Sequence, residues 1–329
     1  MLETIAPDCV EELSQVVAPW QLTLRQLSRG DLKASVGCTP VNDILVTNEC
    51  WQAHVQGLGG TAADYFTIVG NNASFPVFWK GQALVENTLA CAPGNAECEF
   101  HTPHGASHWV MLIPQQNLAD YMGVETPGIP CPESHLLRGD PRQFRRIHAL
   151  AKRILTIPPL TTRSAGSLVA GEQLEGTILA CVADLLGDNA GNSCATTVPG
   201  RYAAYRTAIR YANKTRYAVS SSDLAAAAGV SVRVLQLAFR ENLGISPHRY
   251  LRLGRLSELH GSLRAARSVE TGVTRLMEQC GLHEHGRVAV EYKQLFGESP
   301  SATLARRCGD TRQCFLDILA SSPTSGIAC

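Results

Sequence analysis

Residues 222–240 read SDLAAAAGVSVRVLQLAFR, and this stretch predicts two short helices joined by a glycine turn. Ser222 and Asp223 supply an N-cap and a first-turn acid for an alanine-rich helix. Gly229 is placed to end that helix, because glycine accepts without steric cost the left-handed conformation that closes helices. Ser231 then caps the second helix.

The second helix has an inner and an outer face. Leu235 and Phe239 lie four residues apart and are expected to pack inward as core. The outer face carries Arg233, Gln236, Leu237 and Arg240. A helix, a glycine turn and a helix with an arginine-bearing outer face form the pattern of helix-turn-helix units, whose second helix reads the major groove of DNA.

The same pattern is written a second time further along the chain. The first copy has Leu235, Phe239 and Gly244 at +6, +10 and +15 from Gly229, and the second has Val288, Tyr292 and Gly297 at +7, +11 and +16 from Gly281. Each copy closes on Ser-Pro. Residues 247–263 between the copies predict one helix of about 25 Å, long enough to hold two reading helices roughly one DNA turn apart.

With both copies in order, residues 202–307 resemble the DNA-binding domain of AraC/XylS-type transcriptional regulators. The strings that carry the resemblance are LAAAAGVS, LQLAFR and LGISP at 224–247, and CGLHEHGR, EYKQLFGESPS at 280–301. The resemblance implies a seven-helix, all-α domain that binds double-stranded promoter DNA. It also implies activation through contact with RNA polymerase, a homodimer, and an N-terminal cupin-like β domain that senses a small molecule or holds two chains together.

The resemblance also indicates which side chains reach DNA. The base-reading candidates are Arg233, Gln236 and Leu237 in the first unit and His285 and Arg287 in the second, while Arg240, Lys293 and the cap Ser231 are placed for phosphate. Leu237 stands where many relatives carry an arginine, so its guanine contact is replaced by contact with a thymine methyl or lost. Met277, Leu282 and Val288 depart from the residues usual at those positions. We therefore expect the second helix-turn-helix unit to recognise bases less specifically than the first.

The distribution of charge supports a polyanionic partner. The whole chain is neutral, with 29 basic and 29 acidic residues among 329. Residues 200–309 hold 17 basic residues and eight acids, a net charge of +9, so the remainder carries −9. A basic segment of this kind is the electrostatic footprint of nucleic-acid binding.

The front of the chain predicts a β-rich domain, so the expected fold class is α+β. Short β-branched and aromatic runs broken by glycine and proline fill residues 20–113, which favours a sandwich or barrel. Apolar periodicity predicts helices over 141–155 and 172–186 that either cover the sheet or form a dimer surface. The expected organisation is a sensor or dimerisation domain at 1–186, a linker at 187–200, the DNA-binding domain at 201–308 and a tail at 309–329.

Two groups of front-domain residues are candidates for ligands. Cys98, His101, His104 and His108, with Cys91 nearby, are the metal-binding candidates. Their spacing fits no standard zinc site, and Pro103 and Gly105 favour a turn, so a polar loop without metal is the default expectation. Arg142, Arg145 and Arg146 are candidates for an anionic effector, against the alternative of a solvated helix face. Redox sensing through a pair such as Cys308 and Cys314 is a further alternative.

Other function classes lack their sequence signals. There is no phosphate-binding loop, nucleophile elbow or paired-histidine metalloprotease motif, so neither an enzyme nor a cofactor is predicted, although a metal centre in the β domain stays a formal alternative. No apolar run approaches the ~20 residues of a membrane helix, and the first residues are acidic, unlike a signal peptide. We therefore expect a cytoplasmic protein, with its 12 cysteines reduced and no membrane partner.

Overall fold

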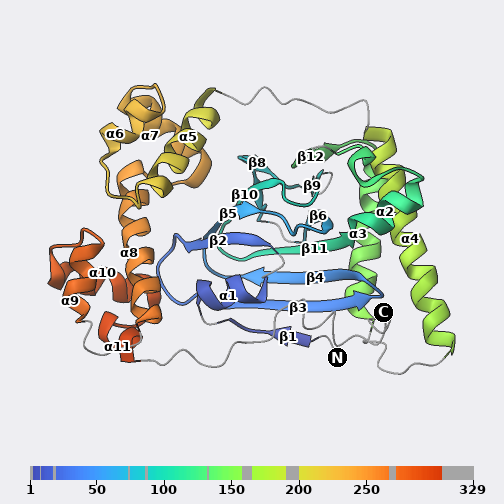
Figure 1. Cartoon of the computed structure of the whole chain (residues 1–329), viewed down its shortest axis with the longest axis horizontal. Helices are drawn as coiled ribbons and strands as arrows, with labels where there is room; N and C mark the ends of the chain where they lie inside the picture. Colours follow the sequence, from blue (N-terminus) through green and yellow to red (C-terminus); the bar gives the residue numbers. More distant parts are fainter. Residues whose placement is uncertain are drawn as a thin grey trace. The chain divides into compact units, whose positions relative to one another are not determined.

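The computed structural model describes residues 3–7, 9–17, 20–72, 75–85, 88–131, 133–157, 165–189, 200–266 and 272–305 (Figure 1). Its internal contacts divide the chain into two compact units. The first comprises the described residues up to Leu24 and from Leu32 to residue 189, and the second comprises Arg25–Asp31 and the described residues from 200 onward. The expected tail at 309–329 and the Cys308/Cys314 pair lie outside the described residues.

The first unit is built on two β-sheets whose recorded strand pairs are antiparallel. The larger sheet has the order β1 (Glu3–Ile5), β3 (Ala34–Val41), β4 (Ile44–Trp51), β11 (Ala106–Pro114), β6 (Tyr65–Asn71), β9 (Thr88–Ala92) and β12 (His135–Arg138). The smaller sheet has the order β2 (Gln21–Gln26), β5 (Val55–Gly60), β10 (Glu97–Thr102), β7 (Phe78–Trp79) and β8 (Gln82–Ala83). The β-rich architecture expected from the sequence is therefore confirmed.

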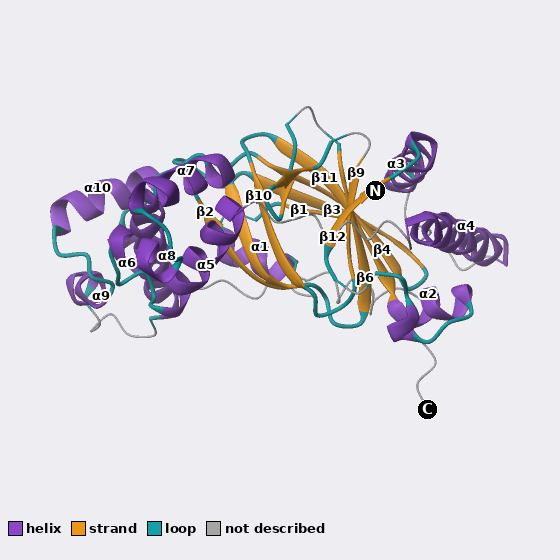
Figure 2. Cartoon of the chain, turned by 90° about the horizontal axis from the view of Figure 1, so that it is seen from above, coloured by secondary structure: helices purple, strands orange, loops and turns teal. Residues whose placement is uncertain are grey.

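Two apolar cores lie on opposite faces of the larger sheet. One core joins it to the smaller sheet, through residues such as Val36, Val55 and Phe100. The other joins it to the helices, through residues such as Phe66 and Trp109. Figure 2 shows α2 (Gln115–Met122), α3 (Pro141–Thr156) and α4 (Ala165–Asn189) gathered on that side of the strands. The first unit is thus a sandwich with helices on its outer face; α1 (Val10–Val16) and the short η1 (Thr126–Gly128) complete it.

The two helices expected in this unit cover the sheet. Asp140 caps α3 by accepting a hydrogen bond from the Arg142 amide, and Phe144, Ile147 and Ile154 form its buried stripe. Helix α4 buries Ile178, Val182, Leu185 and Leu186. It continues to Asn189, three residues into the expected linker. Leu185 and Leu186 just before the linker are core residues, and Asn189 itself is buried. The other linker positions up to residue 199 lie outside the described residues.

The second unit is all-α. Its helices are α5 (Gly200–Lys214), α6 (Ser221–Ala227), α7 (Val232–Leu243), α8 (Pro247–Ala265), α9 (Val273–Gln279), α10 (His285–Phe296) and α11 (Pro300–Ala305). The described residues thus contain the seven helices that the resemblance implied. At 19 residues, α8 is about 28 Å long, slightly longer than the expected joint.

None of the single helices described is long and apolar enough to cross a membrane. The α6–α7 pair, bent by 93°, passes such a test by length and composition only. Its apolar side chains Leu224, Leu235 and Phe239 are buried inside the second unit, which accounts for the composition.

Candidate nucleic-acid interface

The first helix-turn-helix unit begins at a capping box. The Ser220 hydroxyl accepts a hydrogen bond from the Asp223 amide at 3.2 Å, and the Asp223 carboxylate accepts one from the Ser220 amide at 2.8 Å. The Ser220 hydroxyl also donates to the Asp223 carboxylate at 2.7 Å. The hydrogen bonds that the carboxylate accepts from the Ser220 amide and then from its hydroxyl lower the pKa of Asp223. The N-cap predicted at Ser222 is therefore wrong by two residues, because the box requires the acid three positions after the cap.

The turn between the two helices has the expected geometry. Gly229 adopts φ +65°, and the Val230 amide donates to the Ala225 carbonyl at 3.0 Å, which closes α6. The Ser231 hydroxyl accepts from the Val234 amide at 3.3 Å and caps α7. The bend of 93° between the two helices follows from this short, twice-anchored turn.

Helix α7 separates core from surface as its sequence predicts. Leu235 and Phe239 are completely buried, and the Phe239 ring packs edge-on against Tyr205 and Tyr250, with centroid distances of 5.2 and 5.4 Å. The predicted DNA-contacting side chains Arg233, Gln236, Leu237 and Arg240 are all exposed. Leu237 is 39% exposed, an apolar side chain in a polar face. The structure thus brings these four residues onto one accessible surface.

The second helix-turn-helix, formed by α9 and α10, repeats the arrangement with different packing. Gly281 adopts φ +67°. Leu282 and Val288, which depart from the residues usual at those positions, are fully buried, as is Tyr292. No side-chain hydrogen bond caps α10. Inside this part of the chain, the Tyr292 hydroxyl contacts His260 Nδ1 at 2.5 Å and the Thr303 hydroxyl at 2.8 Å. These buried polar contacts link α8, α10 and α11.

The outer face of α10 is basic but partly engaged. Arg287 contacts the carboxylates of Glu284 at 3.3 Å and Glu291 at 3.0 Å. Glu291 also accepts from Arg252 on α8 at 2.8 Å. Burial raises the pKa of Glu291, but hydrogen bonds from Arg252 and Arg287 outweigh it, and the pKa is lowered overall. His285 lies 3.6 Å from Glu278, and Lys293 is exposed.

Helix α8 is fixed against the segment before α6. The Arg255 guanidinium donates to the carbonyls of Tyr217 at 2.8 Å and Val219 at 3.2 Å. A Cβ at Gly254 would lie 2.4 Å from the buried Tyr217 ring, so this position admits only glycine without a shift. The long joint that connects the two units is therefore held along its length.

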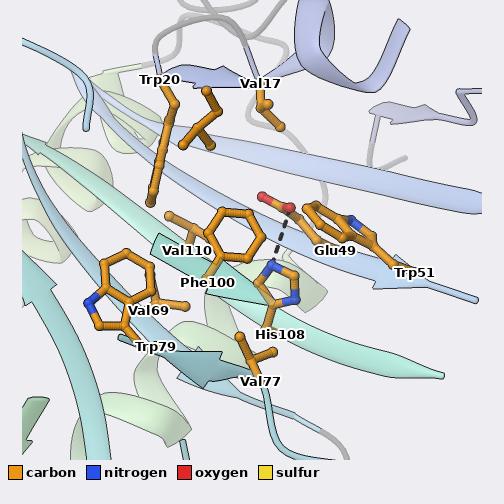
Figure 3. Close-up of a pocket in the computed structure, with 11 residues that line it drawn as sticks. Val17, Trp20, Glu49, Trp51, Val69, Val77, Trp79, Phe100, His108 and Val110 are labelled. Atoms are coloured by element: carbon orange, nitrogen blue, oxygen red, sulfur yellow. Dashed lines mark ion pairs between the residues drawn. The ribbon is translucent and has the colours of Figure 1, made fainter. Parts of the chain in front are cut away.

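A pocket lies in the first unit (Figure 3). The pocket is small, partly open to solvent, and its walls are mainly apolar. The walls include Trp20, Trp51, Trp79, Phe100, Val69 and Val110. On neighbouring strands, His108 Nε2 and Glu49 face each other at 3.3 Å, and Thr47 donates to Glu49 at 3.1 Å. Buried Trp51 Nε1 and His108 Nδ1 have no hydrogen-bond partner among the described residues.

The predicted metal residues do not come together. The polar loop expected at 98–108 is wrong, because Cys98 and His101 belong to β10 and His108 to β11, and only residues 103–105 turn. His101 stacks on Phe78 with centroids 4.5 Å apart, and His104 Nδ1 contacts the Gln52 carbonyl at 2.6 Å. Strand alternation separates the side chains at 98 and 101, because residues three apart point to opposite faces.

The arginines predicted for an anionic effector lie elsewhere. Arg142, Arg145 and Arg146 are on the exposed face of α3, where Arg146 lies 3.8 Å from Asp184, and none lines the pocket. Glu49 and Trp51 were not among the residues predicted from the sequence. Glu49 meets His108 only through the pairing of β4 with β11, and a local sequence pattern does not reveal which strands pair.

Comparison with known proteins identifies the second unit. Residues 224–306 match a family of helix-turn-helix domains. The chain is similar to the probable thc operon regulatory protein of Rhodococcus erythropolis, 43% identical over 76 residues that cover 23% of each chain. It is also similar to XylDLEGF operon transcriptional activator 3 of Pseudomonas putida, 33% identical over 92 residues that cover 28% of each chain. The matching part thus spans about a quarter of the length of these relatives.

A solved structure is similar over a longer stretch. It is the AraC-like transcriptional activator CuxR, 12% identical, with a TM-score of 0.44, covering 80% of this chain and 96% of that one. The assignment itself rests on the second unit, where the duplicated helix-turn-helix geometry and the sequence matches coincide. Through these residues the chain carries a helix-turn-helix domain similar to the DNA-binding domains of AraC/XylS-type transcriptional regulators.

Proposed function

We propose that the chain activates transcription by placing α7 and α10 in successive major-groove segments of promoter DNA. In this proposal Arg233, Gln236, Leu237, His285 and Arg287 contact bases, and Ser231, Arg240 and Lys293 contact phosphates. The observation that carries it is the pair of exposed faces on helices joined by α8, within a segment of net charge +9. When the protein binds DNA in this proposal, Arg287 leaves the carboxylates of Glu284 and Glu291 and contacts a base.

The test begins with footprinting of bound genomic DNA, which supplies the operator. On that operator, Arg233→Ala is expected to weaken binding about 10- to 100-fold and to relax specificity at one position, because a bidentate base contact is worth about 1–3 kcal/mol. Arg210→Ala removes an exposed arginine of α5, which is not one of the two proposed reading helices, and serves as the control. Equal losses in both variants, or no change in sequence preference, would contradict the base-reading role.

Activation and dimerisation are parts of the same proposal. The P. putida relative is named a transcriptional activator, which favours activation through RNA polymerase over repression. A promoter–reporter fusion is expected to be more active with the regulator than without it. Sedimentation of the purified chain is expected to give a homodimer. A monomer that still activates the reporter would remove dimerisation from the proposal.

We further propose that the first unit senses a small molecule in the pocket of Figure 3. Aromatic walls favour a largely apolar ligand, and the buried, unpartnered Trp51 Nε1 and His108 Nδ1 favour a polar group on it. A panel of small aromatic and aliphatic compounds is screened for those that raise the Tm of the protein. Trp51→Phe keeps an aromatic side chain but removes the indole N–H donor, and is expected to weaken binding of a selected compound about tenfold.

Trp109→Phe is the matched control, because Trp109 lies in the other core and donates to His148 at 3.0 Å. Equal loss of ligand affinity in the two variants would exclude a specific contact with Trp51. A panel in which nothing raises the Tm would leave the first unit as a dimerisation domain.

A further inference from the structure

Two thiols and an imidazole meet at the edge of the larger sheet in the first unit. Cys91 on β9 is paired in register with His135 on β12, and Cys131 lies in the segment that leads into β12. Cys91 Sγ lies 3.4 Å from Cys131 Sγ and 3.7 Å from His135 Nε2. One ligand atom from each of the three residues lies within 4.8 Å of the others. None of the contacts proposed with DNA or with the pocket uses this cluster.

These separations match a metal's coordination sphere. Zinc binds thiolate sulfur at about 2.3 Å and imidazole nitrogen at about 2.0–2.1 Å, so neighbouring ligand atoms in a tetrahedral site stand roughly 3.5–3.8 Å apart. The observed 3.4 and 3.7 Å require only small adjustments. Cys131 Sγ lies 3.9 Å from His135 Nδ1, so its side chain must turn toward Nε2 to share the ion. Both sulfurs are buried and His135 is half-buried, so the cluster is closed on the sulfur side and accessible on the imidazole side.

The surroundings orient the imidazole. His135 Nδ1 lies 2.7 Å from the Glu133 carbonyl, so Nδ1–H donates and the lone pair of Nε2 is left for a metal. A histidine ligand that donates its other N–H to a backbone carbonyl is the usual arrangement in metal sites. Lys80 donates to the Ser134 carbonyl at 2.6 Å, which anchors the residue between the two ligands.

We propose that Cys91, Cys131 and His135 form a site for one thiophilic metal ion of the zinc class. Two thiolates and one neutral imidazole would bind the ion, with release of the thiol protons, and leave a fourth position open. The ion would tie β9 to the segment before β12. The same segment contacts the pocket, because Nε1 of the pocket residue Trp79 donates to the Ser134 hydroxyl at 2.9 Å.

The site differs from the one expected from sequence. Cys131 and His135 are separated by three residues, a spacing that is common by chance, and Cys91 lies 40 positions earlier. Only the pairing of β9 with β12 brings them together.

The test uses the full-length protein, purified under reducing conditions and stripped with a chelator. Addition of Zn²⁺ is expected to give one bound equivalent by elemental mass spectrometry, and Co²⁺ is expected to give the visible absorption of tetrahedral thiolate coordination. Cys131→Ser and His135→Gln are each expected to weaken Zn²⁺ binding more than about 100-fold. Cys50→Ser, a half-buried cysteine on β4 outside the cluster, is the control and is expected to keep the full equivalent.

A second measurement on the wild-type chain avoids variants that fail to fold. Bound Zn²⁺ is expected to slow alkylation of Cys91 and Cys131 relative to the stripped protein, while the alkylation of Cys50 stays unchanged. Less than one equivalent of metal, or full binding by the Cys131→Ser variant, would overturn the proposal. A stripped protein that proves to hold a Cys91–Cys131 disulfide and takes no metal after reduction would overturn it as well.

Discussion

Single positions in the second unit are constrained by close contact. Gly254→Ala places a methyl group 2.4 Å from the ring of Tyr217, which is buried and cannot move aside freely. We expect the free energy of unfolding to fall by about 1–3 kcal/mol. Denaturant unfolding of the wild-type and variant chains measures this difference.

Gly261→Ala on the same helix provides the control, because its added Cβ meets no described atom within 4 Å beyond its chain neighbours and the adjacent backbone of its own helix. This substitution is expected to raise the free energy of unfolding by up to about 1 kcal/mol, since alanine favours the helix. Similar effects at the two glycines would show that close packing on Tyr217 is not the cause.

A second residue makes stability depend on pH. Burial, and then the charge of His104, lower the pKa of His54 from 6.5 to about 4. The folded state therefore binds fewer protons than the unfolded state between these values, and stability is lost as the pH falls from about 6.5 through 4. The contribution is about 3 kcal/mol at most.

Unfolding of the wild-type chain and of His54→Gln is compared between pH 7 and pH 4, a range set by the two pKa values. The wild-type chain is expected to lose more stability across this range than the variant, whatever the difference at pH 7. Parallel pH profiles would show that the pKa of His54 does not change on folding.

At the scale of elements, helix ends decide where the recognition unit begins. Ser220→Ala removes the capping box of α6 and is expected to cost about 1 kcal/mol. Ser222→Ala changes an exposed residue inside the first turn and is expected to stay within about 0.5 kcal/mol of the wild type. A larger loss of unfolding free energy in Ser222→Ala than in Ser220→Ala would show that Ser222, the residue predicted from the sequence, is the N-cap.

The helix-turn-helix units were predictable from sequence because their determinants are local. Gly229, Ser231 and the spacing of Leu235 and Phe239 act within one or two turns, and each has the expected role in the structure. The cap of α6 was misplaced because three serines stand in a row, and only the reciprocal bond from Asp223 selects Ser220. Cap choice is thus a matter of geometry among similar residues.

At the scale of the whole molecule, the charges of the two halves oppose each other. Residues 200–309 carry +9 and the rest −9. A fragment beginning at residue 200 is expected to bind non-specific DNA more tightly than the full chain at about 50 mM salt, with the difference shrinking near 200 mM as charges are screened. Equal non-specific affinity at low salt would show that the acidic half has no such effect.

Local patterns in the sequence specify the two helix-turn-helix units, the faces of their second helices, the β-rich character of the front and the segregation of charge. These properties follow from hydrophobic period, caps and composition, which act over a few residues. The contact of His108 with Glu49, and that of Cys91 with Cys131 and His135, arise from the three-dimensional arrangement of the strands. The same arrangement keeps Arg142, Arg145 and Arg146 away from the pocket. Those contacts depend on strand order and register, which join residues up to 59 positions apart and which period-two alternation leaves open.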